Sequence, residues 1–289
     1  MAVDLEHYQL SELVVPGAGR GESRGSRRMG LIGVGIFVTV VALALLAPLI
    51  RPGPDAISLL TTLRPPSWAH PFGTDSEGRD LLARVLAAAR IDLLIGVGGS
   101  LLSFVIGSSL GVLIGYSRGP LGELAMRILD AVQAFPLLIL ALAMLAFLGQ
   151  STLTIIYAVA FVNVPIFIRL VRAETVAVND LPYMEAARCV GCSPKRLIAR
   201  HLLPNVITSA LTQLTTTAGY AILLTGGLSF LGVGVSQPTA EWGSLVQGGV
   251  DYLVTKQWWL TVFPGLAIVV TVLSLQMMGE ALVRGRRVR

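Results

Sequence analysis

Residues 93–116 read LLIGVGGSLLSFVIGSSLGVLIGY and contain no charged side chain. A run of this length forms a helix long enough to cross the roughly 30 Å hydrocarbon core of a bilayer. The chain as a whole has the same character, because 54% of its 289 residues are hydrophobic, only 13% are charged and the mean hydropathy is +0.73. A soluble domain of this size needs far more polar surface. The composition therefore predicts an all-α, polytopic membrane protein.

Five further apolar runs predict five more membrane spans. A cleaved signal peptide is the alternative for the first run, but Arg51-Pro52-Gly53-Pro54 follows it in place of a cleavage site with small residues. Prolines at three positions inside the runs predict local kinks: Pro136, Pro165 and Pro264. In chain order, the six predicted spans cover residues 29–50, 93–116, about 128–148, 151–168, 206–231 and 258–278.

Basic residues predict which side of the membrane each end of the chain occupies. Six spans place both termini on one side, and that side carries 16 of the 22 Lys and Arg residues against 6 on the other. Cytoplasmic loops carry the excess of Lys and Arg. We therefore expect a multi-pass membrane protein with a cytoplasmic tail over 1–28, an extracytoplasmic segment over 51–92, a core of spans over 93–283 and a basic cytoplasmic tail over 284–289.

Gly107, Gly111 and Gly115 form a small-xxx-small ladder on one face of the second predicted span. Such a ladder lets another helix approach closely. That helix could belong to the same chain or to another subunit, and the sequence leaves both alternatives open.

The middle of each predicted span is free of ionisable residues. Proton- or sodium-coupled carriers bury an ionisable residue at depth to hold the coupling ion, and an intramembrane enzyme needs reactive groups there. The energy for any transport is therefore expected to enter from outside the bilayer.

Residues 169–205 form a long polar segment on the expected cytoplasmic side. Pro182 suits the first turn of a short helix, and Gly191 suits the position just after its end. A second short helix follows and is expected to end at Pro204. The pattern predicts two short helices in an elbow, with Glu185 exposed on the first.

The elbow carries a spaced motif. Glu185-Ala186-Ala187 is followed after three residues by Gly191, and after nine more by His201, with Leu203-Pro204 close behind. This spacing resembles the EAA–x3–G–x9–I–x–LP loop of ABC-importer permeases, with His201 in place of an aliphatic residue. In that family the first helix, the coupling helix, sits in a cleft of a separate ATPase subunit. The resemblance implies a coupling loop over 172–205 with these contact residues: Glu185, Ala186, Ala187, Arg188, Gly191, Leu203 and Pro204.

The expected outer segment carries a second motif. Thr74 and Glu77 fit a capping box, and Asp80 and Arg84 are spaced for an ion pair on the helix that would follow. That helix is predicted to lie at the outer interface with an apolar face of Leu81, Leu82, Val85, Leu86 and Ala89. The stretch also resembles the FGTDxxGRD signature of the dipeptide/oligopeptide/nickel branch of ABC importers, in its C-type permease subunit. The matching positions are Phe72, Gly73, Thr74, Asp75, Gly78, Arg79 and Asp80.

A third stretch resembles the LSFLGLG…P…WG segment of the same branch. It runs LSFLGVG over 228–234 and continues with Pro238 and Trp242-Gly243. A Gly-rich turn with an interfacial Trp is the alternative reading. The three motifs extend the resemblance from about residue 30 to residue 285.

The resemblance implies one half of the permease of a type I ABC importer in the bacterial inner membrane, with residues 93–283 as its permease core. Its partners would be a homologous B-type permease, two ATP-binding subunits and an extracytoplasmic substrate-binding protein, with no nucleic acid. Because the chain has no GxxxxGK[ST] sequence, ATP and Mg²⁺ are expected on the partner subunits, and this chain is expected to be no enzyme and to bind no cofactor or metal. The implied cargo is di- or oligopeptides, with nickel complexes, glutathione or haem as alternatives. An ATP-independent carrier and a membrane scaffold are the alternatives from other classes.

Cys189 and Cys192 form a CxxC within the elbow. A CxxC without a second pair is weak evidence for zinc or redox chemistry. Small residues packed in a helix–turn are the favoured interpretation.

Overall fold

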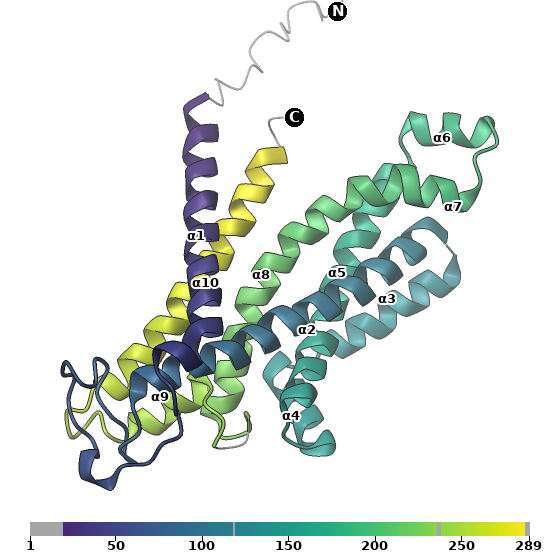
Figure 1. Ribbon diagram of the computed structural model, residues 1–289. Coiled ribbons are helices and arrows are strands. Elements are labelled where there is room, and N and C mark those ends of the chain that lie inside the picture. The colour runs from purple at the N-terminus through teal and green to yellow at the C-terminus, as the bar shows by residue number, and fades with distance from the viewer. Residues whose placement is uncertain (1–19, 118, 236–237, 287–289) are drawn as a thin grey trace, which may run out of the picture.

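The computed structural model describes residues 20–117, 119–235 and 238–286, and these are almost entirely helical (Figure 1). Apart from one isolated bridge between Thr74 and Asp80, they contain no β structure, so the all-α prediction is confirmed. The elements are α1 (Arg20–Ile50), η2 (Leu59–Thr61), α2 (Leu81–Ser117), α3 (Pro120–Gln133), α4 (Leu137–Leu148), α5 (Thr152–Asn179), α6 (Pro182–Cys189), α7 (Pro194–Leu197), the π-helical turn η3 (Ile198–Leu202), α8 (Leu203–Phe230), α9 (Trp242–Val250) and α10 (Trp259–Arg286).

Four of the described helices, α1, α2, α5 and α10, are long and apolar enough to span a membrane. The pair α3 and α4 qualifies only if the two count as one span, and they are bent by 89° at their junction. α8 is 28 residues long and runs between the two ends of the bundle, but it is not among the apolar helices (Figure 1). The count of six spans therefore stays a prediction.

The predicted span over about 128–148 is two helices, and the bend at Pro136 is much sharper than the local kink expected there. Pro136 sits at the break, where its backbone is extended at φ −56° and ψ 129°. Proline has no N–H to donate and disfavours helical backbone in the residue before it, so α3 ends at Gln133 and α4 starts afresh at Leu137.

The outer amphipathic helix is not a separate interfacial element, because residues 81–92 are the first turns of the long α2. The two polar residues just before the predicted second span, Arg90 and Asp92, make hydrogen bonds within the fold. Arg90 donates to the carbonyls of Ala44 and Leu45 near the end of α1, both at 2.6 Å. Asp92 is 1% exposed and accepts from another element. Asp92 comes just before the predicted span over 93–116, so the expectation that the middle of each span holds no ionisable residue stays a prediction.

The glycine ladder packs within the chain, against α5. A Cβ on Gly107 would lie 2.5 Å from Phe167, and one on Gly111 would lie 2.9 Å from both the Ile168 carbonyl oxygen and Val171. Gly115 meets Thr175 in the same way, one turn further along. Repeats of four residues on both helices give a close contact between backbones. The second alternative, a contact with another subunit, is not needed to explain these glycines.

Both described chain ends lie at the same end of the bundle, where α1 pairs with α10 (Figure 1). The tail predicted over 1–28 is helical from Arg20, and residues 1–19 fall outside the described chain. The basic tail predicted over 284–289 continues α10 as far as Arg286, with residues 287–289 outside the described chain.

Candidate functional site

The predicted elbow exists and lies at the end of the bundle away from α9 (Figure 1). Its first helix, α6, starts with Pro182 at its first position, as predicted. Gly191 follows the helix with φ +80°, a backbone conformation that favours glycine. Cys192 N–H donates to the Ala187 carbonyl at 3.1 Å and Gly191 N–H to the Arg188 carbonyl at 2.9 Å, which together form a Schellman motif. Gly191 therefore sets the turn between the two helices.

The side of α6 that faces the protein is anchored by Met184, a residue that the sequence analysis did not single out. Met184 is fully buried in a cluster with Leu197 and Leu202 of the second half of the elbow and Val171 of α5. Its apolar character was visible, but it stood outside the recognised motif. This contact fixes α6 against the bundle.

The opposite side of α6 is open. Glu185 and Ala186 are exposed, as are Tyr183 at 43% and Val190 at 80%, whereas Ala187 is half-buried. Two apolar residues, a small residue and a carboxylate thus form one outward surface. Exposure of this kind on a helix is a feature of interaction sites.

Arg188 has a different environment from the other matched residues. Its guanidinium donates to the side-chain oxygen of Asn179, and to the Asn179 carbonyl at 3.4 Å. Asn179 is the last residue of α5, so Arg188 ties α6 to the end of that helix. Its observed contacts position α6, while the residue itself is exposed like its neighbours on that helix.

Pro204 does not end the second helix of the elbow, so that expectation is wrong. Leu203 N–H donates to the Ile198 carbonyl across the wide π turn, and α8 continues directly from Leu203. Pro204 is tolerated there because it lies in the first turn of α8, where a missing N–H costs little. Leu203 and Pro204 are both exposed, while Leu202 is fully buried. The second half of the elbow and α8 therefore form one continuous helical path.

Cys189 and Cys192 are both free thiols, the first exposed and the second half-buried. Cys192 packs beside Ala187 at the edge of the Met184 cluster. This agrees with a small residue packed in a helix–turn.

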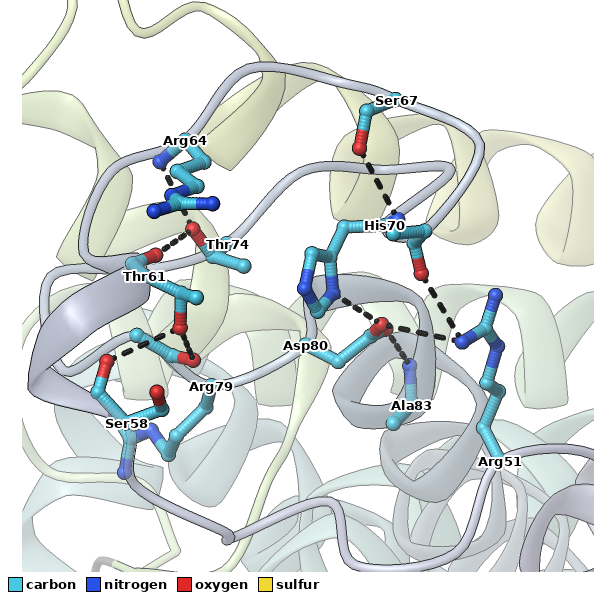
Figure 2. A network of polar contacts seen from close by, with 12 residues as sticks. Arg51, Ser58, Thr61, Arg64, Ser67, His70, Thr74, Arg79, Asp80 and Ala83 are labelled. Atoms are coloured by element: carbon cyan, nitrogen blue, oxygen red, sulfur yellow. Dashed lines mark hydrogen bonds and ion pairs between the residues drawn. The ribbon is translucent and has the colours of Figure 1, made fainter.

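The outer signature residues form a network of polar contacts (Figure 2). The Thr74 hydroxyl accepts from Arg64 N–H at 2.8 Å and donates to the Thr61 carbonyl. Thr74 is therefore not a helix cap. Asp80 caps α2 instead, because its Oδ1 accepts from Ala83 N–H at 2.9 Å, and its Oδ2 faces His70 Nδ1 at 2.9 Å. The predicted capping box is wrong.

The predicted pair between Asp80 and Arg84 is also wrong. Arg84 is 3% exposed, and its guanidinium lies 2.9 Å from Asp55 and 3.8 Å from Asp75. Asp75 in turn binds the Nε of Arg79 at 2.7 Å. Arg84 therefore pairs with carboxylates from more distant positions and not with Asp80, four residues before it. The reason is that α2 starts with its polar side turned into the loop.

Phe72, Gly73 and Gly78 of the signature also hold the outer segment in place. Phe72 stacks on Phe263 of α10 with ring centroids 4.0 Å apart. Gly73 and Gly78 have φ of +78° and +75°, and Gly78 packs against the Ser58 backbone. The signature residues thus hold the outer segment together, and Asp75 and Arg79 also line a cavity of about 110 Å³ between this segment and α9.

The stretch after α8 contains a short helix, α9, that the sequence analysis did not predict. Trp242 is 1% exposed, so its interfacial interpretation is wrong. Its backbone N–H donates to Asp92 at 3.0 Å and its indole N–H to the Val85 carbonyl at 2.9 Å. The Glu241 carboxylate caps α9 by accepting from Gly243 and Ser244 N–H groups. These bonds lock α9 onto α2.

Comparison with known proteins decides the family. The profile described as "Binding-protein-dependent transport system inner membrane component" matches residues 107–288. The chain belongs to this family. The predicted resemblance to permeases of ABC importers and the type I permease fold are confirmed, and the chain is a multi-pass membrane component of such a transporter.

Curated relatives of the family cover most of the chain. A putative peptide transport system permease protein of Brucella suis biovar 1 (strain 1330) is 40% identical, over 93% of this chain and 90% of its own length. A probable D,D-dipeptide transport system permease protein of Escherichia coli (strain K12) is 38% identical, over 86% and 83%. A glutathione transport system permease protein of Escherichia coli O1:K1 / APEC is 40% identical, over 75% and 71%.

Proposed function

We propose that this chain forms half of the translocation pathway of an ATP-driven peptide importer and receives the force of ATP hydrolysis through α6. The observation that carries the proposal is the two-sided character of α6. Met184 and Arg188 fix one side to the bundle, while Glu185, Ala186 and Val190 face outward. Tyr183 is also exposed, and its hydroxyl accepts from Asn205 Nδ2 at 3.3 Å. The partner that we propose for this surface is a separate ATPase subunit.

The elbow is suited to transmit force. α7, η3 and α8 form one helical path, and Leu197 and Leu202 bury their side chains beside Met184. A displacement of α6 would therefore move the start of α8, which leads toward α9 at the other end (Figure 1). Helices packed in this way can move as units, so a local push can become a movement of whole elements.

The remaining parts of the machine follow from family membership. We infer a homologous B-type permease partner, two ATP-binding subunits that carry ATP and Mg²⁺, and an extracytoplasmic binding protein. The elbow and both termini would face the cytoplasm, in keeping with the excess of basic residues on that side. In this arrangement the chain itself catalyses no reaction.

Two kinds of cargo have support among the relatives. The peptide and dipeptide permeases cover the larger share of this chain, which favours peptides. The glutathione permease makes that small peptide a second candidate. Nickel complexes and haem remain alternatives within the same machinery, since the binding protein makes the first selection.

The test is to change the open surface of α6 and measure coupling. In the assembled complex in proteoliposomes, Glu185→Lys or Gly191→Val is expected to lower the number of peptides imported per ATP by about tenfold, because each disturbs one docked helix. The matched control is Glu123→Lys, the same change on an exposed residue of α3. Normal uptake and ATPase activity in both elbow variants would refute the coupling role.

The same preparation separates the two other classes. Uptake that continues without ATPase subunits and follows an ion gradient would identify a secondary carrier. A complete complex with every partner present and no flux of peptide or glutathione would identify a scaffold.

A further inference from the structure

The outer segment exposes apolar side chains that do not contribute to the core. Ile57, Leu59 and Leu60 are 62%, 78% and 88% exposed, and η2, which carries two of them, contains no buried residue. In Figure 1 the dark-blue segment after α1 reaches the end of the molecule opposite both termini, beyond the end of α1. We call Ile57, Leu59 and Leu60 the outer tip.

The outer tip is held in place from behind. Ser58 N–H donates to the Glu77 carbonyl at 3.2 Å, and the Thr61 hydroxyl lies 3.2 Å from the Gly78 carbonyl (Figure 2). Leu63 adopts a left-handed backbone at φ +52° while its side chain packs on the core. A surface that is already ordered loses little conformational entropy when a partner binds.

An unpaired cation lies beside the outer tip. Arg64 is exposed, and its guanidinium donates to the Leu60 carbonyl at 2.9 Å. Within the described residues it makes no ion pair, whereas three arginines of the same region do: Arg51, Arg79 and Arg84. Apolar side chains next to an arginine with free donors match the composition of centres of protein–protein interfaces.

We propose that the outer tip and Arg64 form a docking surface for the extracytoplasmic binding protein on which this family depends. The partner would present an apolar pocket with a carboxylate at its edge. The proposal rests on the proposed function as an importer subunit. A bilayer is the weaker occupant, because the tip projects past the end of α1 and its backbone is fixed in a shape that fluid lipid does not require.

The experiment uses the whole transporter in nanodiscs and the substrate-binding protein that supports its uptake of peptides, labelled for a binding titration. The variants are Leu59→Ser with Leu60→Ser, and separately Arg64→Glu. Each is expected to raise the Kd for the binding protein about tenfold or more and to reduce its stimulation of ATP hydrolysis, with basal hydrolysis unchanged. The matched control is Val254→Ser, a residue 90% exposed on the loop between α9 and α10, which should bind as wild type.

Several outcomes would overturn the proposal. The first is a Kd within about twofold of wild type in both tip variants. The second is an equal loss of affinity for the binding protein in Val254→Ser. The third is that the tip variants change only the retention of the permease by vesicles that lack the binding protein. Failure of the ATPase subunits to co-purify with this permease would instead refute the proposed function. The failure of the docking proposal and the failure of the proposed function are therefore distinguishable. Unchanged thermal melting of the variants checks that the outer segment remains folded.

Discussion

Gly78 and Gly191 adopt nearly the same left-handed backbone, with φ of +75° and +80°, at opposite ends of the molecule. A Cβ on Gly78 would lie 1.8 Å from the carbonyl oxygen of Ser58, whereas a Cβ on Gly191 would meet nothing within 4 Å. The first glycine belongs to a loop packed on all sides, and the second to a turn surrounded by space. The outer segment is thus a region that the chain packs with its own atoms, whereas the turn of the elbow is a region where the chain leaves space unfilled.

The same contrast extends to the side chains around each glycine. In the outer segment, Thr74, Asp75 and Arg79 are all buried and bonded to one another or to nearby backbone. In the elbow, α6 is fixed mainly through Met184 and Arg188. A region with few internal contacts has a low cost of local movement. This is what a segment moved by a partner requires.

The largest effect is expected for Gly78→Ala. The added methyl group must displace the Ser58 backbone, and the left-handed backbone adds further strain, so we expect a loss of about 4 kcal/mol of stability or failure to accumulate. The measurement is the melting temperature of the purified permease in detergent. A melting temperature equal to that of wild type would mean that the outer segment is not the packed region described above.

Asp75→Ala is expected to be the next largest. The carboxylate accepts from Glu77 and Arg79 N–H groups and pairs with the Arg79 side chain, and its loss leaves buried charge without compensation. We expect about 3 kcal/mol of destabilisation by the same melting measurement. The control is Asp130→Ala, whose exposed carboxylate pairs with the exposed Arg169 and should contribute under about 1 kcal/mol. Equal losses in the two variants would contradict the burial argument.

The two regions also differ in how far the sequence predicted them. In the elbow, Pro182 and Gly191 act through local backbone geometry, so helix start and turn were predictable from the residues themselves. In the outer segment, the partners of Arg84 and Asp80 come from elsewhere in the loop, and the local pairing predicted from spacing does not form. Contacts between distant positions have no signal in a single sequence.

The membrane helices show the same limit. Apolar runs predicted where helices would lie, but α2 continues through Arg90 and Asp92 because α1 and α9 satisfy these residues. The break at Pro136 was expected to be a kink and is instead a near right angle between two helices. Whether a helix continues through a polar residue depends on the tertiary contacts of that residue. A search for apolar runs cannot include these contacts.

Met184→Ala tests the anchor of the open region. Truncating this fully buried side chain should cost about 2 kcal/mol, confined to the elbow, because the cluster around it loses its contact with α6. Hydrogen exchange of α6 should accelerate strongly, while exchange in α2 and α5 stays the same. Val190→Ala, at a position 80% exposed, is the control and should leave exchange unchanged. Slow exchange of α6 in Met184→Ala would show that other contacts hold the helix.

The smallest effect on stability is expected for Gly191→Ala. Space is open around this position, so the cost is the left-handed backbone alone, about 1 kcal/mol, and the Schellman bonds to Arg188 and Ala187 can persist. Gly98→Ala is the control, because Gly98 also has nothing within 4 Å but lies inside α2, where alanine is favoured. If Gly191→Ala melted as early as Gly78→Ala, the turn at 191 would be packed against something, and the elbow would not be the open region. If the variant melts nearly as wild type and yet imports fewer peptides per ATP, the loss must arise where α6 meets its partner, because the fold itself has lost almost nothing.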